Sequence, residues 1–159
     1  MEQKALKAFD KALQKNPNKL DGIYYLAARK LGVNENTLSF IYALGDGKPH
    51  SQKQICEEWL IPKTTINTIV KEMTEAGYVT LLAGEHTREK AIVLTDKGKK
   101  YVTDIIKNIY EAEQNAIKST IQEYSPQFVE AFDFFAGRLY DEFQKQILNQ
   151  SVLPKTTHY

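Results

Sequence analysis

The stretch SQKQICEEWLIPKTTINTIVKEMTEAGYV, residues 51–79, predicts two short helices separated by a tight turn. Ser51 followed three residues later by Gln54 is a capping box, which opens the first helix. Apolar side chains recur along this helix, and we expect it to bury four of them: Ile55, Cys56, Trp59 and Leu60. Pro62 then starts the second helix, because the fixed φ of proline suits a first helical turn.

The second helix has two different faces. Apolar residues recur at i, i+3, i+4 and i+7, and they make one stripe of Ile66, Ile69, Val70 and Met73. Gly77 follows as the glycine that typically ends a helix. The opposite face carries polar groups: Thr64, Thr68, Lys71 and Glu75, flanked by Asn67. We therefore expect one side to pack on a core and the other to present short polar side chains.

The residue period changes after Gly77. Residues 78–82 are mostly β-branched or aromatic, a polar turn occupies 83–88, and 91–94 are apolar again, which predicts a β-hairpin. Thr95 and Asp96 then cap a long helix. A further helix begins at 125–126 and carries an aromatic stripe: Phe128, Phe132, Phe135 and Phe143. A helix, a turn, a helix and a hairpin follow one another in this order in a winged helix-turn-helix.

Helices are also predicted before residue 51. The pattern over 6–31 is helical, with a break expected at the Asn-Pro-Asn of 16–18. Asn34 caps a short helix, which the glycines of 45–47 stop. The predicted fold class is mainly α with a small β-hairpin wing (α+β), a winged helix-turn-helix between long amino- and carboxyl-terminal helices.

Composition sets further bounds. The 159 residues are 42% hydrophobic and 26% charged, which fits one compact domain with a core of its own. No run approaches the roughly 20 apolar residues of a membrane span, and the amino terminus is charged, so we expect a cytoplasmic protein. The single cysteine and the three histidines have no metal-ligand spacing, so neither a metal nor another cofactor is expected.

The formal net charge is only +1, and it is unevenly distributed. The balance is +4 over 1–33, zero over 34–100 and −3 over 101–159. A nucleic-acid surface on the central segment must therefore rest on a few placed cations.

The stretch from Leu31 to Tyr101 resembles the MarR family of bacterial transcription factors in the order and spacing of its elements. The family pattern has a wing with Asp-x-Arg, then a Leu-Thr-x-x-Gly signature, which Gly98 closes in GEHTREKAIVLTDKGKKYV. Counting back places His86 and Arg88 in the wing. The arginine matches, but the aspartate that supports it in the family is replaced.

Two further points concern residues that differ from the family pattern or could compensate for a difference. Glu85 and Glu89 are the neighbouring candidates for supporting the wing arginine. In the recognition helix, Thr68 stands where the family usually has an arginine, which implies an altered base preference.

The resemblance implies a regulator that binds double-stranded DNA as a homodimer, and we expect a repressor. It also implies one domain over 1–159, with a winged helix-turn-helix lobe at 34–100, dimerisation helices at 1–33 and 101–150, and a tail at 151–159. Family members often bind small anionic aromatic compounds. Tyr24, Tyr25 and Tyr42 would line such a cleft or serve as core or interface residues, so the effector stays unassigned.

The expected DNA-binding residues lie on the second helix and the wing. Short polar groups let the backbone approach the major groove and read base edges, and four are present: Thr64, Thr65, Asn67 and Thr68. Asparagine pairs with adenine and threonine methyls pack on thymine, which predicts a half-site containing A·T pairs. Lys63 and Lys71 would contact phosphate, and Arg88 beside His86 would enter the minor groove.

Alternatives remain open at three places. Cys56 is either a small buried hydrophobe or a redox sensor, and the aromatic stripe of 128–143 is core, dimer interface or ligand site. An enzyme is not expected, because the sequence has no phosphate-binding glycine loop and no nucleophile motif. The main rival is a winged helix that contacts only proteins, which the near-neutral charge and Thr68 favour.

Overall fold

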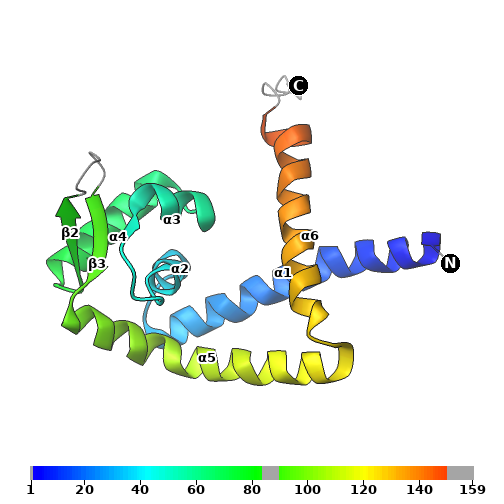
Figure 1. Cartoon of the computed structure of the whole chain (residues 1–159), viewed down its shortest axis with the longest axis horizontal. Coiled ribbons are helices and arrows are strands. Elements are labelled where there is room, and N and C mark those ends of the chain that lie inside the picture. Colours follow the sequence, from blue (N-terminus) through cyan, green and yellow to red (C-terminus); the bar gives the residue numbers. More distant parts are fainter. Residues whose placement is uncertain (1, 84–89, 150–159) are drawn as a thin grey trace, which may run out of the picture. The chain divides into compact units, whose positions relative to one another are not determined.

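The computed structural model describes residues 2–83 and 90–149. In chain order its elements are α1 (Glu2–Leu31), α2 (Glu35–Ala43), β1 (His50–Ser51), α3 (Gln52–Glu58), α4 (Lys63–Glu75), β2 (Val79–Ala83), β3 (Lys90–Leu94), α5 (Asp96–Tyr124), α6 (Gln127–Phe143) and the short π-helix η1 (Gln144–Leu148) (Figure 1). The predicted fold class, mainly α with a small β wing, is confirmed. No helix within the described ranges is long and apolar enough to span a bilayer.

The chain divides into two compact units, Met1–Tyr110 and Glu111–Tyr159. The first holds α1 to β3 and the beginning of α5, and the second holds the rest of α5 with α6 and η1.

In the first unit, α1 is one continuous helix, so the break expected at 16–18 is wrong. Proline removes one backbone donor from a helix interior, and its ring crowds the carbonyl of the preceding turn. Here the side-chain amide of Asn18 donates a 2.9 Å hydrogen bond to the carbonyl oxygen of Gln14, across the turn that contains Pro17. The helix ends at Gly32, where φ is 75°, and the Val33 amide donates back to the carbonyl of Ala28.

The predicted caps of the next two helices are confirmed. The Asn34 side chain accepts a hydrogen bond from the Thr37 amide at the start of α2. Ser51 and Gln54 form the reciprocal capping box of α3, with N···O distances of 2.8 and 3.1 Å. Both caps satisfy backbone donors that an isolated helix end would leave unpaired.

The burial predicted for α3 is only partly right. Ile55 is buried and Cys56 is half-buried, but Trp59 is 40% and Leu60 67% exposed. The reason is that α3 ends at Glu58, so the helical period no longer applies. Leu60 takes a left-handed φ of 52°, and the turn inserts Ile61 into the core instead.

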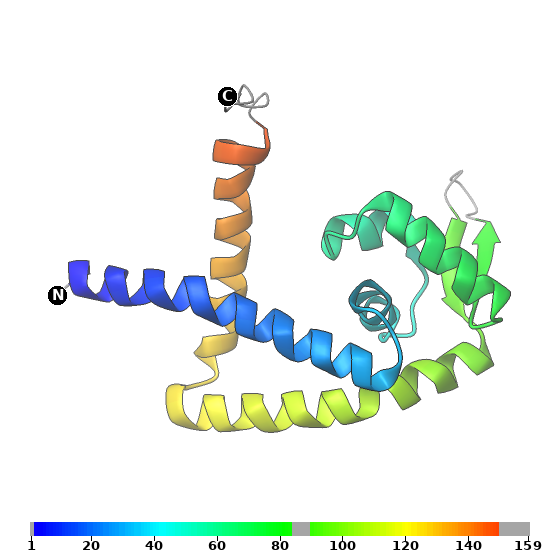
Figure 2. The ribbon, with the colours of Figure 1, turned by 180° about the vertical axis from the view of Figure 1, so that it is seen from behind.

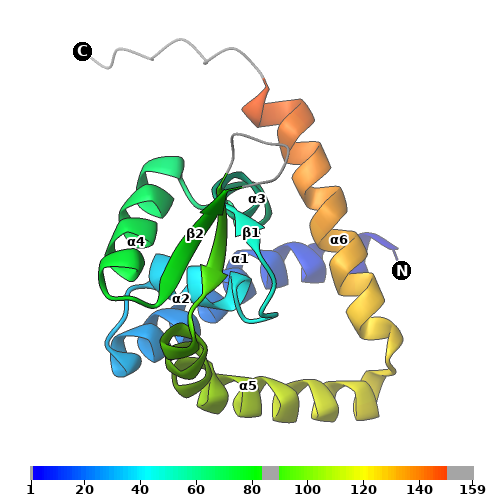
Figure 3. The same ribbon diagram turned by 60° about the vertical axis from the view of Figure 1, so that its left-hand side comes forward.

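The hairpin of β2 and β3 is confirmed, and it gains a third strand. β2 and β3 pair antiparallel from Val79 opposite Leu94 to Ala83 opposite Lys90. β1 adds to the free edge of β3, so the strand order is β1-β3-β2 (Figure 3). A two-residue strand leaves too short a pattern for sequence reasoning to find it.

One hydrophobic core joins the helices of the first unit with strands β2 and β3. The predicted apolar stripe of α4 is buried in it, and Figure 2 shows the carboxyl end of α1 beside α2. Its buried members come from helices and strands alike: Ala28, Leu38, Phe40, Ile41, Ala43, Leu44, Ile55, Ile61, Ile66, Ile69, Val70, Met73, Val79, Ile92, Leu94, Val102 and Ile105. Since Ala28 belongs to α1 and Ile105 to α5, both flanking helices are anchored to the winged helix-turn-helix.

In the second unit, α6 is amphipathic but has no buried residue. Ser125, at a φ of 100°, separates it from α5, and Phe128 stacks on Phe132 with ring centroids 6.0 Å apart. The aromatic stripe of 128–143 is therefore not a core of this chain by itself. The large apolar side chains that α6 leaves exposed are Phe128, Val129, Phe132, Phe134, Leu139, Tyr140 and Phe143.

Candidate nucleic-acid interface

Helix α4 presents the expected polar face to solvent. Five of the six candidate residues on this helix are exposed and Thr65 is half-buried; the exposed ones are Lys63, Thr64, Asn67, Thr68 and Lys71. Pro62 precedes the helix, and no side chain caps its amino end. The first backbone N–H groups of α4 are thus left for water or an acceptor from outside the chain, at the positive end of the helix dipole.

Two of these side chains have partners within α4 that affect how they could contact a ligand. The Thr68 hydroxyl donates a 3.2 Å hydrogen bond to the carbonyl oxygen of Thr64, so its proton is already used within the helix. The Lys71 ammonium lies 3.9 Å from the carboxylate of Glu75, with both side chains more than half exposed. An ion pair of this kind is weak, but it lowers the positive potential at Lys71.

A network of hydrogen bonds fixes the wing to the end of α4. The Thr95 hydroxyl donates to the carbonyl oxygen of Gly77 at 2.7 Å and accepts from the amide of Gly98 at 3.0 Å. The Thr95 amide donates to the carbonyl oxygen of Tyr78 at 3.0 Å. One residue therefore caps α5 and also holds the chain between α4 and β2.

Gly98 permits this junction because it has no side chain. A Cβ atom built at Gly98 would lie 1.8 Å from the carbonyl oxygen of Tyr78, which is far inside contact distance. Lys97 adds a 2.7 Å hydrogen bond from its ammonium to the carbonyl oxygen of Ala76, and its charge lies 4.8 Å from the centre of the Tyr78 ring. The signature glycine was found from sequence, but its close approach to Tyr78 was not.

The two candidates on the wing, His86 and Arg88, lie outside the described residues. The last described pair of the hairpin is Ala83 opposite Lys90.

Of the three tyrosines considered for an effector cleft, two lie together. Tyr24 and Tyr42 meet edge to face with centroids 6.4 Å apart, and Tyr42 stacks on Trp59 at 6.3 Å. Tyr25 instead contacts Arg29, whose guanidinium lies 5.7 Å from the centre of its ring. The cluster that the structure assembles is thus Tyr24, Tyr42 and Trp59, and sequence reasoning had placed Trp59 in the core.

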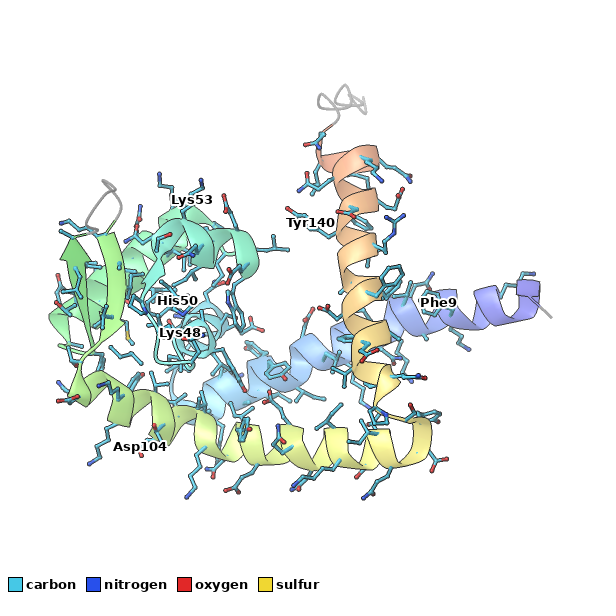
Figure 4. The ribbon with its side chains drawn as sticks, in the orientation of Figure 1. Phe9, Lys48, His50, Lys53, Asp104 and Tyr140 are labelled. Atoms are coloured by element: carbon cyan, nitrogen blue, oxygen red, sulfur yellow. The ribbon has the colours of Figure 1, made fainter. Side chains whose placement is uncertain are left out.

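Two titratable groups near the winged helix-turn-helix are perturbed. The hydrogen bond from His50, at 2.8 Å, lowers the pKa of the Asp46 carboxyl, and the Lys48 amide adds to this effect; Figure 4 labels His50 and Lys48. Burial raises the pKa of Tyr101, whose ring stacks on Tyr78 with centroids 4.1 Å apart. Neither group lies on the polar face of α4.

Comparison with known proteins leads to one group of relatives. Residues 31–89 match the model of the MarR family. YwoH of Bacillus subtilis, named an uncharacterized HTH-type transcriptional regulator, is 27% identical over 104 residues, which make up 65% of this chain and 76% of that protein. The predicted resemblance is confirmed, and the name of YwoH describes a transcriptional regulator and not an enzyme.

Solved structures share the fold. A MarR family regulator from Neisseria meningitidis has a TM-score of 0.71 at 20% identity, and the match covers 89% of this chain and 97% of that one. NadR in complex with 4-hydroxyphenylacetate has a TM-score of 0.67 at 16% identity, covering 81% of this chain and 90% of that one.

Proposed function

We propose, from the match of residues 31–89 to the MarR family, that the protein is a cytoplasmic transcriptional regulator that binds double-stranded DNA sequence-specifically. The observation that supports it best is the solvent-facing polar side of α4, opposite its buried apolar stripe. In a winged helix this is the side that enters the major groove. The regulator acts as a repressor.

Each candidate residue has a role in this proposal. Asn67 reads a base edge, and Thr64, Thr65 and Thr68 give the backbone close access and contact thymine methyl groups. Lys63 and Lys71 contact phosphates. His86 and Arg88 extend the contact to the adjacent minor groove. The half-site accordingly contains A·T pairs.

The working form is a homodimer on a two-fold symmetric operator. The dimer is supported by the large apolar side chains that each unit leaves exposed to solvent. Examples are Leu20, Ile23 and Leu26 on α1 and the exposed apolar residues of α6. Monomeric proteins rarely leave apolar surface of this extent uncovered. The segments 1–33 and 101–150 serve as dimerisation helices, 34–100 as the DNA-binding lobe and 151–159 as a tail, within one domain. A two-fold dimer also matches a two-fold operator.

A small aromatic effector releases the DNA in this proposal. NadR has been solved with 4-hydroxyphenylacetate, and the present chain has the partly exposed aromatic cluster of Tyr24, Tyr42 and Trp59. Aromatic rings of this kind favour an aromatic ligand through edge and stacking contacts.

Selection from a random pool of duplexes by the purified chain tests the proposal. Enrichment of a two-fold symmetric sequence with A·T pairs supports it. Failure to enrich any sequence contradicts it and leaves the alternative, a winged helix that contacts only proteins, which the balanced charge of 34–100 favours.

A further inference from the structure

A cavity beside the recognition helix is lined by positively charged side chains from three separate elements. It has a volume of about 450 Å³ and is lined by Gln52, Lys53, Cys56, Glu57, Lys63, Leu81 and Lys90. Lys53 comes from α3, Lys63 from the first turn of α4 and Lys90 from the start of β3. Figure 4 labels Lys53 on α3, with its side chain extending away from the ribbon.

The charge of this cavity differs from that of its surroundings. Residues 34–100 carry as many acidic as basic side chains, yet the cavity lining has three lysines and a single carboxylate, Glu57. None of the three lysines forms an ion pair with any described residue, whereas Lys71 pairs with Glu75. Unpaired lysines that share one concavity raise its affinity for an anion.

Lys63 adds a second contribution. It is the first residue of α4, whose amino end has no side-chain cap, so backbone donors and the helix dipole act in the same region. Leu81 and Cys56, which also line the cavity, are half-buried and add apolar surface to it. A phosphodiester of DNA has this combination of properties, because its charged oxygens lie next to the apolar C–H groups of deoxyribose.

We propose that this cavity, the lysine pocket of Lys53, Lys63 and Lys90, binds a phosphate group of the DNA backbone beside the recognition helix. The inference rests on the proposed function and assigns it two residues, Lys53 and Lys90, that the α4 face and the wing tip do not include. It places the main phosphate contact of the lobe at this pocket, and a weaker one at Lys71.

The test measures duplex affinity over a range of salt for the full chain and for Lys53→Gln and Lys90→Gln. Lys100→Gln, an exposed lysine of α5 outside the pocket, is the control for the loss of one charge. Each pocket variant is expected to reduce the slope of log K against log salt by about one and to weaken binding to all sequences alike. Pocket variants that match the control would overturn the proposal while the proposed function stands.

The single cysteine gives an independent readout, because Cys56 lines the pocket. Bound duplex is expected to slow alkylation of Cys56 by iodoacetamide several-fold in the parent chain and less in Lys53→Gln. If the parent chain binds no duplex, the proposed function is wrong, and so is the proposal that the pocket binds a phosphate of DNA. If inorganic phosphate protects Cys56 and duplex does not, the phosphate bound in the pocket does not belong to DNA. The pocket would then bind a free phosphate compound.

Discussion

The hydroxyl group of Thr95 donates a 2.7 Å hydrogen bond to the carbonyl oxygen of Gly77, 18 residues earlier in the chain. Gly77, with a φ of 74°, lies just beyond the carboxyl end of α4, and Thr95 precedes α5. The bond therefore connects the end of the recognition helix to the base of the wing. In the proposed function the helix and the wing contact DNA together, so the DNA-binding surface depends on their relative orientation.

Replacing Thr95 by valine is expected to lower the free energy of unfolding by about 1–2 kcal/mol, since the change removes a helix cap and a bond to Gly77. Urea unfolding measures this loss. Thr103→Val is the matched control, because the Thr103 hydroxyl donates only to the Lys99 carbonyl within α5. Equal effects of the two substitutions would show that the Thr95 bonds stabilise the chain no more than a hydroxyl bond within a helix does.

Alanine at Gly98 is expected to destabilise the chain by about 1–3 kcal/mol or more, because the new Cβ would collide with the Tyr78 carbonyl oxygen. Gly137→Ala in α6 is the control, since a Cβ there meets nothing within 4 Å, and we expect it to be neutral or to stabilise by about 0.5–1 kcal/mol. Thermal or urea unfolding of both variants checks the contrast. A stable Gly98→Ala chain would contradict the close approach.

Burial raises the pKa of Tyr101 above the ordinary 10.0, so the folded chain disfavours its phenolate. The stability that the neutral ring contributes is complete below the unfolded pKa and is lost as the pH rises through the folded pKa. We expect the unfolding free energy to fall above about pH 10, and to fall less in Tyr101→Phe. Tyr110→Phe, an exposed tyrosine of the same helix, should leave the fall unchanged.

Local signals in the sequence predicted most of the fold. The caps at Asn34 and Ser51 and the stripe of α4 depend on neighbours within a few residues, and all three are confirmed. Trp59 and Leu60 were placed wrongly because their burial depends on where α3 stops. That end is set by a turn with an uncommon left-handed leucine, which no periodicity indicates.

Part of the candidate site could likewise be predicted from local sequence, and part could not. The polar face of α4 could be read from one helix, since residues three and four apart share a side. The lysine pocket could not, because its three lysines lie ten and 27 residues apart in the chain and meet only through packing of α3, α4 and β3. Strand β1 was missed because it consists of two residues that pair with a strand far along the chain.

Asn67→Ala is expected to relax base preference at one position of each half-site, by about 1–3 kcal/mol, while other positions keep theirs. Competition binding with single-base variants of the selected duplex measures this change. Asn108→Ala, an exposed asparagine of α5, controls for the loss of an amide. An unchanged base preference in Asn67→Ala would contradict the role assigned to this residue.

Arg88→Ala is expected to weaken operator binding by roughly 1 kcal/mol or more, because a minor-groove arginine is lost. Affinity for the selected duplex measures the loss, with Arg138→Ala on α6 as the matched arginine control. Parent-like binding by Arg88→Ala would contradict the minor-groove role assigned to this arginine.

Binding of the full chain to its selected duplex, measured across a salt series with the solution mass of the free protein taken alongside, decides whether this protein is a dimeric DNA-binding regulator. We predict binding that weakens steeply with salt, because each neutralised phosphate releases counterions, by a protein of twice the chain mass. A monomer that binds no duplex, or binds without dependence on salt, would contradict the central claim and favour a winged helix that contacts proteins.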